Sequence, residues 1–222
     1  QSNLTAWELV KENPVIRDVE YKDVELLWWG TTDLGHFLMK HPIKTVEDLK
    51  GKKIRSPSTV GNDVLAALEA VPVSLPVSDA YDAIERNIVE GTLLPISTLI
   101  SFNLADVVDY VLVMNQYATP LHMVANKNSW AKISPEDQKL IKDMLEEFPR
   151  KIGEQYVRED EAGYKKAEEA GITVERVSPE ELQKFKDKLE PLVSKWLDDM
   201  ETDGLPGWEV YNQIKTISEK YK

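Results

Sequence analysis

Apolar and polar positions follow two different periods along the chain. The run VELLWWG at 24–30 is short, apolar and closed by a glycine, which favours a buried strand. In 78–91 the residues Tyr81, Ile84 and Ile88 recur at spacings of three and four, which predicts an amphipathic helix. Further extended segments are expected at 52–58, 71–78, 110–114, the first residues of 121–130, and 171–178.

Side chains that can cap a helix mark where the predicted helices begin. Thr45 is followed three positions later by Asp48, and this pair predicts a capping box. A serine followed by proline and acidic residues, as at 134–137 and 178–181, is a typical helix start. The first of these helices is expected to continue to residue 170, with a kink at Pro149. Caps are predicted at Thr5, Thr45, Asn62, Ser134 and Ser178.

Predicted strands and helices alternate through the chain, and long helices dominate its C-terminal part. This order is the α/β pattern, and it predicts a mostly parallel sheet. A length of 222 residues is enough for one large domain or for two smaller lobes with apolar cores.

The acidic composition narrows the range of partners. The chain carries 39 Asp and Glu against 27 Lys and Arg, a formal charge of −12, and has no basic tract. Phosphate backbones are bound by clustered cations, so nucleic acid is excluded as a partner. No apolar run is long enough to span a bilayer. The chain contains no Cys, which excludes a disulfide scaffold and thiolate chemistry.

Residue types that carry catalysis are present, but not in catalytic patterns. The histidines His36, His41 and His122 have no metal-ligand spacing with one another or with a pair of carboxylates. The sequence has no G-x-S-x-G elbow and no phosphate-binding loop. We therefore expect no catalytic residues, no bound metal and no cofactor, and an enzyme is the least favoured interpretation.

Residues 46–91 carry an ordered set of short motifs, VEDLKGKKIRSPSTVGNDVLAALEAVPVSLPVSDAYDAIERNIVEG. An acidic-Leu-Lys-Gly-x-Lys-Ile-Arg segment ends at Arg55. Pro-Val, Ser-Asp-Ala-Tyr-Asp-Ala and Val-Glu-Gly follow, and Pro95 lies four residues beyond the last glycine. In this order the motifs resemble the solute-binding proteins of tripartite ATP-independent periplasmic (TRAP) transporters, the DctP-like family. The resemblance continues through MVANKNSWAKISPEDQKLI at 123–141.

The resemblance implies an α/β fold of the periplasmic-binding-protein type, with two lobes and long C-terminal helices. Members of that family are longer than this chain, which implies that lobe I is incomplete and lacks its N-terminal part. On this basis 4–32 and 121–168 are assigned to the remainder of lobe I, and 33–120 and 169–222 to lobe II. Residues 1–3 are interpreted as the remnant of a cleaved tag.

The same resemblance implies a role for Arg55, because the family uses this arginine to hold the carboxylate of its ligand in a cleft between the lobes. A guanidinium matches a carboxylate with two parallel hydrogen bonds, which supports that role chemically. The neighbouring Lys50, Lys52 and Lys53 are interpreted as solvated residues around a glycine turn.

Departures from the sialic-acid and C4-dicarboxylate members favour an apolar cleft. Residues 30–44 contain no arginine, and Val77 and Leu94 stand where those members have an aromatic residue and an Asn. If both line the cleft, the expected ligand is a monocarboxylate with an apolar or aromatic body, since hydroxyls left unpaired are costly. The alternative is that both belong to the core. Trp28 is a further candidate for ligand contact beside Trp29, with both in the core as the alternative.

The partners and location follow from the resemblance as well. It implies a periplasmic subunit, with a signal peptide in the full-length protein, that binds a small organic acid and delivers it to TRAP membrane subunits. The alternative is a periplasmic ligand-sensing domain that signals to a partner protein. Neighbouring genes for two membrane subunits would favour the transporter. Because a truncated lobe leaves strand edges uncovered, the chain is also expected to self-associate.

Overall fold

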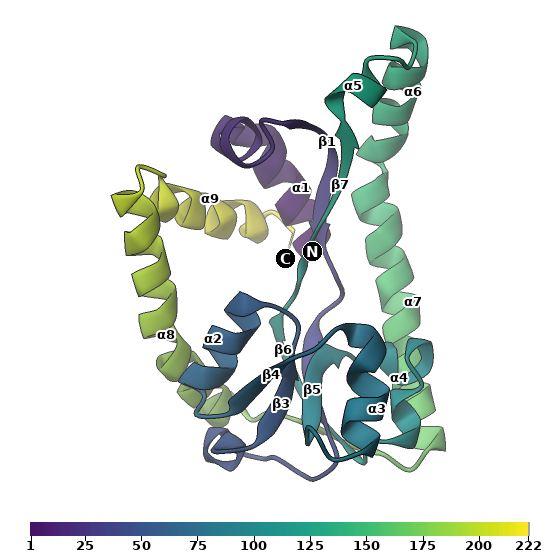
Figure 1. Cartoon of the computed structure of the whole chain (residues 1–222), viewed down its shortest axis with the longest axis vertical. Helices are drawn as coiled ribbons and strands as arrows, with labels where there is room; N and C mark the ends of the chain where they lie inside the picture. The colour runs from purple at the N-terminus through teal and green to yellow at the C-terminus, as the bar shows by residue number, and fades with distance from the viewer. Residues whose placement is uncertain (222) are drawn as a thin grey trace. The chain divides into compact units, whose positions relative to one another are not determined.

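The computed structural model describes residues 1–221, which form two compact units (Figure 1). Unit 1 contains Gln1–Asp33, Ala118–Val157 and Leu197–Lys222, and unit 2 contains Leu34–Tyr117 and Arg158–Trp196. The sequence predicts 197–222 with the second lobe, whereas these residues lie in unit 1. Their place there follows from α9, Gly207–Glu219, which packs on α1, Ser2–Glu12.

Unit 2 is built on a six-stranded mixed sheet with the strand order β4-β3-β5-β2-β6-β8. Its strands are β2 (Gly35–Met39), β3 (Lys53–Ser56), β4 (Val71–Ser74), β5 (Gly91–Pro95), β6 (Tyr110–Tyr117) and β8 (Thr173–Arg176). The β4-β3, β3-β5 and β6-β8 pairs are parallel, as predicted. Strand β2 is antiparallel to both of its neighbours, and the sequence pattern did not predict this strand.

One continuous row of side chains crosses this sheet from edge to edge. The pairing registers join Val73, Arg55, Thr92, Leu38, Val111 and Val174, one residue from each strand. Residues in register on neighbouring strands point to the same face of a sheet. The row therefore places the charged Arg55 and the polar Thr92 side by side within an otherwise apolar layer.

Both faces of this sheet are covered by helices (Figure 1). One apolar cluster joins Phe37 and Ile54 to Leu65 of α2, Thr59–Ala67, and to Phe185 of α8, Pro179–Thr202. The second cluster, on the face of Arg55, joins Leu38 and Val111 to three helices. These are α3 (Ala80–Glu85), α4 (Thr98–Ser101) and α7 (Phe148–Glu169).

Unit 1 has a much smaller sheet. Strands β1, Val24–Thr31, and β7, Pro120–Asn126, form an antiparallel pair whose register shifts between Leu26 and Trp28. Helix α1 packs on β1, and α6, Pro135–Glu146, also contacts this strand. The Trp28 ring packs edge-on against Phe148 with 5.0 Å between ring centres. Gly30 is required beside this ring, because an added Cβ would lie 2.2 Å from a Trp28 carbon.

Three of the predicted helix caps are confirmed and two are wrong. Thr45 and Asp48 form the predicted capping box. The Ser134 and Ser178 hydroxyls accept hydrogen bonds, each of 3.1 Å, from the backbone amides three residues later. Thr5 lies inside α1, which begins at Ser2. Helix α2 begins at Thr59 and is capped by Ser58, so Asn62 is an internal residue.

Two of the predicted helices are shorter than expected. The single helix predicted from Ser134 with a kink at Pro149 consists of α6 and α7. They are separated at Glu147, and Pro149 occupies the tolerated first turn of α7. The helix predicted for 78–91 is α3 alone, because Asn87 adopts a left-handed conformation with φ 56° and ends it. Ile88 consequently lies outside the buried stripe and is 50% exposed.

Candidate functional site

The topology of unit 2 points to one edge of its sheet as the place for a ligand. Strand β3 lies between β4 and β5. After β3 the chain first forms β4 on one side of it and later forms β5 on the other side. Open α/β sheets bind ligands beyond the carboxyl ends of their strands at such a switch point. At this edge the three parallel strands end at Ser56, Ser74 and Pro95.

Arg55 is the charged residue of β3 next to this edge, and it is buried, with 3% of its surface exposed. Its Nε donates a hydrogen bond of 2.8 Å to the backbone carbonyl of Leu75. Its Nη1 has no hydrogen-bond partner within the described protein, and no carboxylate among residues 1–221 forms an ion pair with it. Burial lowers the pKa of the guanidinium below its usual value, and Tyr117 acts in the opposite direction.

A buried cation without an anion is costly, so this arrangement favours the binding of an anionic group. The guanidinium keeps donors that no described residue uses, and one of its nitrogens is already fixed by the Leu75 carbonyl. A carboxylate can accept two parallel hydrogen bonds from a guanidinium.

A cavity of about 370 Å³ lies at the ends of β3 and β4, next to the carbonyl of Leu75 that holds Arg55. It is lined by Ser56, Pro57, Ser58, Thr59, Asn62, Ser74, Leu75 and Pro76. Leu75 joins the two features, because its carbonyl holds the guanidinium while the residue lines the cavity. The Ser58 hydroxyl accepts from the Gly61 amide at 3.1 Å, and the Asn62 amide nitrogen donates to the Ser74 hydroxyl at 3.0 Å.

These hydroxyl and amide residues are candidates that the sequence interpretation missed. The signal was the polar run Ser56-Pro57-Ser58-Thr59, which leaves a strand and starts a helix. Ser74 could not be linked to that run from the sequence, because only the parallel pairing of β3 and β4 brings Ser56 and Ser74 into register.

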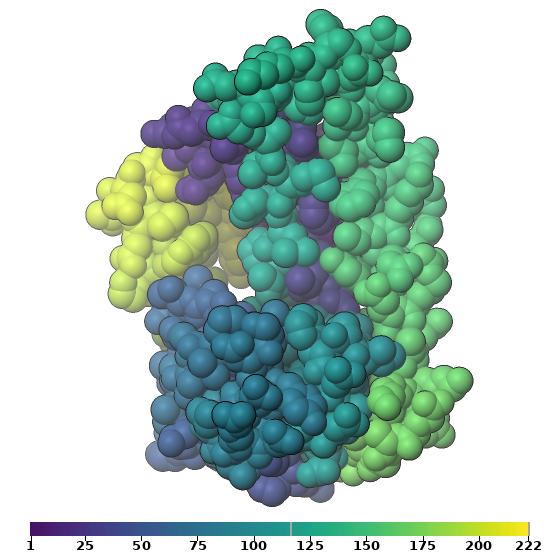
Figure 2. Space-filling view, turned by 45° about the vertical axis from the view of Figure 1, so that its right-hand side comes forward, coloured from purple at the N-terminus to yellow at the C-terminus, as the bar shows by residue number. Residues whose placement is uncertain are grey.

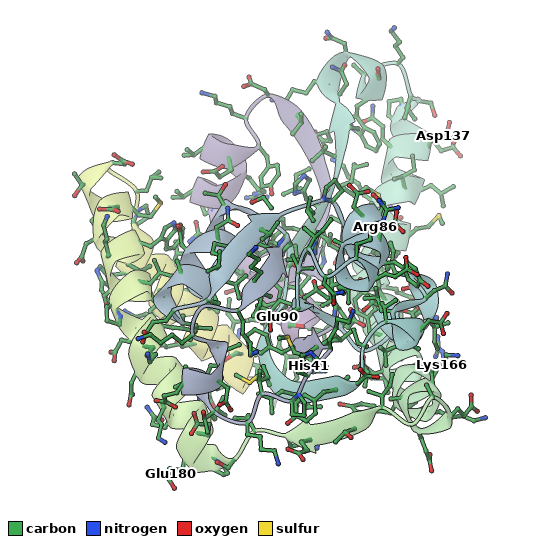
Figure 3. The ribbon with its side chains drawn as sticks, turned by 60° about the horizontal axis from the view of Figure 1, so that its bottom comes forward. His41, Arg86, Glu90, Asp137, Lys166 and Glu180 are labelled. Atoms are coloured by element: carbon green, nitrogen blue, oxygen red, sulfur yellow. The ribbon has the colours of Figure 1, made fainter. Side chains whose placement is uncertain are left out.

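The lysines near Arg55 lie at the opposite end of β3. Lys52 pairs with Glu90 at 2.9 Å, and Lys50 pairs with Glu69 at 2.9 Å. Burial acts to raise the pKa of Glu90. Lys52, the Lys53 amide and His41 outweigh burial, and the pKa of Glu90 is lowered. Figure 3 shows His41 next to Glu90. Lys52 and Glu90 directly precede β3 and β5, so this pair lies at the edge of the sheet away from the cavity.

Leu94 and Val77 lie in the same unit as Arg55. Leu94 is two residues after Thr92 on β5, half-buried, and it packs against the second apolar cluster on the face of Arg55. Val77 is half-buried and begins the short 3-10 turn Val77–Asp79, directly after Pro76 of the cavity. Figure 2 shows the closely packed surface formed by this part of the chain, drawn in blue.

Trp28 and Trp29 belong to unit 1. Trp28 is 4% exposed, and its Nε1 has no hydrogen-bond partner within residues 1–221. Trp29 is half-buried and is hydrogen-bonded to Tyr21, whose pKa is raised mainly by burial. The structure thus places the Trp28 side chain in the core of unit 1 and Arg55 in unit 2.

His36 lies on the same face of the sheet as Arg55, since it is in register with Leu94. It is 1% exposed, and its Nδ1 has no partner among the described residues. Burial lowers the pKa of His36 to about 4; a hydrogen bond with the Gly35 backbone opposes this shift, and Arg176 adds to it. His36 is therefore neutral at pH 7 and does not add positive charge to the Arg55 site.

Residues 1–221 contain no group of three or more His, Asp or Glu arranged to hold a metal ion. Across the same residues, none of the helices combines the length and apolar character needed to traverse a bilayer.

Comparisons with known proteins agree on one family. The family model described as "Bacterial extracellular solute-binding protein, family 7" (DctP) matches residues 5–199. The ectoine-binding periplasmic protein TeaA of Halomonas elongata is 29% identical over 180 residues, which are 78% of this chain and 51% of that protein. The sialic acid-binding periplasmic protein SiaP of Vibrio cholerae is 25% identical over 162 residues, covering 70% of this chain and 48% of that protein. The chain thus spans about half the length of these curated relatives.

Solved structures have the same fold. A TRAP solute-binding protein of Rhodoferax ferrireducens in complex with copurified benzoate superposes with a TM-score of 0.89 at 25% identity, over 99% of this chain and 70% of that one. A marine metagenome protein specific for aromatic acid ligands, with 3-hydroxybenzoate, gives a TM-score of 0.87 at 25% identity, over 100% of this chain and 71% of that one.

Proposed function

The chain belongs to the family of bacterial extracellular solute-binding proteins, family 7, and we propose that it is the ligand-binding part of a TRAP transporter subunit. The family is extracytoplasmic, and the relatives are solute-binding proteins, not enzymes. In this proposal the protein captures a small organic acid outside the cytoplasm and delivers it to the membrane subunits of the transporter.

The observation that carries the proposal is the buried Arg55 at the switch point of the unit 2 sheet, whose guanidinium pairs with no carboxylate among the described residues. A carboxylate bound to this guanidinium would supply the missing negative charge. Charge-assisted hydrogen bonds of this kind contribute about 1.5–3 kcal/mol, whereas micromolar affinity needs about 8 kcal/mol. Arg55 would therefore set the orientation of the ligand, and burial of the ligand body would supply most of the remaining free energy.

The proposed ligand is a monocarboxylate with an apolar or aromatic body. Val73, Leu75 and Leu94 pack in the apolar cluster on the face of Arg55, and an apolar surface of this kind leaves sugar hydroxyls unpaired. Two of the similar structures contain benzoate and 3-hydroxybenzoate, which supports the same ligand class. In this proposal Val77 and Leu94 contact the ligand body.

Titration calorimetry with benzoate, succinate, ectoine and sialic acid tests the proposal. Arg55→Ala should raise the Kd for benzoate at least tenfold, which is about 1.4 kcal/mol or more. Arg55→Lys should recover only part of the loss, because an ammonium lacks the planar fork. Arg86→Ala is the matched control, since Arg86 is an exposed arginine of the same unit (Figure 3).

Two outcomes separate the parts of this proposal. If Arg55→Ala binds every acid as the parent does, the carboxylate site is wrong. If the parent prefers succinate or sialic acid to benzoate, the apolar selectivity is wrong while Arg55 keeps its role. Leu94→Asn should move the preference toward hydroxylated or dicarboxylic acids, because it adds a donor and an acceptor to an apolar surface.

A second part of the proposal concerns self-association through β1. Four consecutive residues of this strand, Val24–Leu27, line a groove of about 740 Å³ in unit 1. Consecutive residues point to opposite faces, so a groove lined by all four runs along the edge of the strand. The edge of β1 opposite β7 pairs with no strand of the described residues. An unpaired edge is a template for pairing with another strand, and the proposed occupant is the same edge of a second copy.

Sedimentation velocity over a range of protein concentrations tests this pairing. The parent chain should form a concentration-dependent dimer, and Leu27→Lys should weaken it because a charge on a strand edge disfavours pairing. Val157→Lys is the control, since Val157 is a 58% exposed apolar residue of unit 1 outside the groove. A parent that stays monomeric at every concentration would refute the pairing.

A further inference from the structure

Arg55 and Thr92 form the polar pair in the row of side chains that crosses the unit 2 sheet. They are in register on the neighbouring parallel strands β3 and β5, so their side chains leave the same face side by side. Thr92 is 0% exposed and Arg55 is 3% exposed. The rest of the row consists of Val73, Leu38, Val111 and Val174.

Each member of this pair has a buried polar atom without a partner in the protein. The Nη1 of Arg55 and the Oγ1 of Thr92 are both inaccessible to solvent and make no hydrogen bond within residues 1–221. Buried polar groups in native proteins are almost always hydrogen-bonded, to protein or to ordered water. Two such atoms on adjacent strands, with apolar neighbours along the row, therefore call for a shared partner.

The burial of both atoms decides what kind of partner this is. Both atoms are closed off from solvent, so a partner that they share has to be small enough to be enclosed with them inside the protein. A single water molecule can accept a hydrogen bond from Nη1 and form a second hydrogen bond with the Thr92 hydroxyl. The hydroxyl can be either the donor or the acceptor of this second bond. Internal waters typically occupy such sites between otherwise unpaired polar groups.

We infer that Thr92 is a positioning residue of the carboxylate site, whose hydroxyl shares one buried water with Nη1 of Arg55. The Leu75 carbonyl fixes Nε at 2.8 Å, and the water fixes Nη1, so that the guanidinium is held at two of its nitrogens. A guanidinium held in this way presents its remaining donors to a ligand in one orientation. The inference rests on the proposed function, because it explains how the proposed carboxylate contact is oriented.

Thr92→Val tests this inference because it removes the hydroxyl and keeps the shape of the side chain. Calorimetry should give a Kd for benzoate about tenfold higher than that of the parent, while Thr92→Ser should stay within about twofold. Thr98→Val is the matched control. Thr98 is also a buried threonine of unit 2, 6% exposed, but its hydroxyl donates to the Pro95 carbonyl and not toward Arg55. Its benzoate affinity should equal that of the parent.

A double-mutant cycle in urea unfolding separates the shared water from a general packing role. Thr92→Val should destabilise the parent, because it leaves Nη1 unpaired. In an Arg55→Met background the same change should cost nothing, since both polar partners are then gone. Equal costs in the two backgrounds would overturn the inference.

The outcomes also distinguish this inference from the proposed function. If Arg55→Ala binds benzoate normally, the carboxylate site itself is wrong. If Arg55→Ala loses binding while Thr92→Val binds as the parent does, only the role of Thr92 is wrong. A tenfold loss in Thr98→Val as well would also overturn that role, because the effect would then follow from any buried threonine of the unit.

Discussion

In unit 2 the sheet has six strands, and apolar clusters pack against both of its faces, whereas the sheet of unit 1 consists of β1 and β7 alone. The two extended clusters, with their partly buried neighbours, lie entirely within unit 2. Unit 1 buries fewer apolar side chains, among them Leu9, Trp28, Trp130 and Ile217. The exposed apolar residues Met123 and Val124 belong to its strand β7.

This difference shows which unit can hold a precise site. A two-stranded sheet is marginally stable by itself, while a larger sheet with helices on both faces fixes its side chains in place. Arg55 is buried within that larger sheet, and its Nε is held by the Leu75 carbonyl. The proposed ligand contact thus rests on the rigid unit, and the following predictions test the difference between the two units.

The largest effect is expected from equivalent core truncations in the two units. Leu38 is 0% exposed in unit 2 and Leu9 is 1% exposed in unit 1. Leu38→Ala should lower the free energy of unfolding by about 4 kcal/mol and Leu9→Ala by about 2 kcal/mol, because a looser surrounding collapses more readily into the cavity. Urea unfolding of both variants measures these values. Equal losses would contradict the difference in packing.

Hydrogen exchange should give the next largest difference. The amides of β2, β5 and β6 should open only with global unfolding, whereas β1 and β7 should open at a free energy lower by about 3 kcal/mol, or roughly 100-fold more often. Exchange measured by NMR or mass spectrometry over the two sets of strands checks this. The comparison would be refuted by equal protection of both sheets.

Features set by neighbouring residues in the sequence could be predicted, whereas features set by contacts between distant residues mostly could not. Neighbouring residues in the sequence predicted that Arg55 lies on a short strand after a glycine turn. The structure confirms this, because Arg55 belongs to β3. The α/β class was predicted for the same reason and is confirmed. Strand β2 was missed because all five of its residues are buried, so the period of two that marks a half-buried strand is absent.

The candidate site was predicted less completely than the fold. Ser74 reaches the cavity only through the pairing of β3 with β4, and Thr92 lies beside Arg55 only through the pairing of β3 with β5. These registers join residues far apart in the sequence, and a single sequence carries no local signal for them. The cap of α2 was assigned to Asn62 instead of Ser58, because both are good capping residues and only the start of the helix distinguishes them.

The stability of the protein should fall at low pH because His36 is buried in unit 2. Its pKa is about 4 in the folded protein, mainly because of burial, against an ordinary value of 6.5. The unfolded chain therefore binds the proton more tightly, and stability present above pH 6.5 is lost as the pH falls. From pH 7 to pH 5 this loss is about 2 kcal/mol. Comparing parent and His36→Phe by urea unfolding at both pH values isolates it, and an unchanged pH dependence in the variant would contradict it.

The smallest effect is expected in one helix that contributes residues to both units. In α7, Gly153 belongs to unit 1 and Gly163 to unit 2. A Cβ added at Gly153 would meet nothing within 4 Å, whereas at Gly163 it would lie 2.8 Å from the Ile96 carbonyl carbon and oxygen. Gly153→Ala should therefore raise the free energy of unfolding by about 1 kcal/mol through helix propensity, because the residue has no packing constraint.

Gly163→Ala makes the same gain in propensity but forces backbone apart, so its net effect should be destabilising. Thermal unfolding of the two variants beside the parent measures both signs. Opposite signs for one substitution within one helix would show that close backbone packing is a property of unit 2. Stabilisation of similar size at both positions would instead mean that α7 can move away from Ile96 without cost, and that unit 2 is less tightly packed than its contacts indicate.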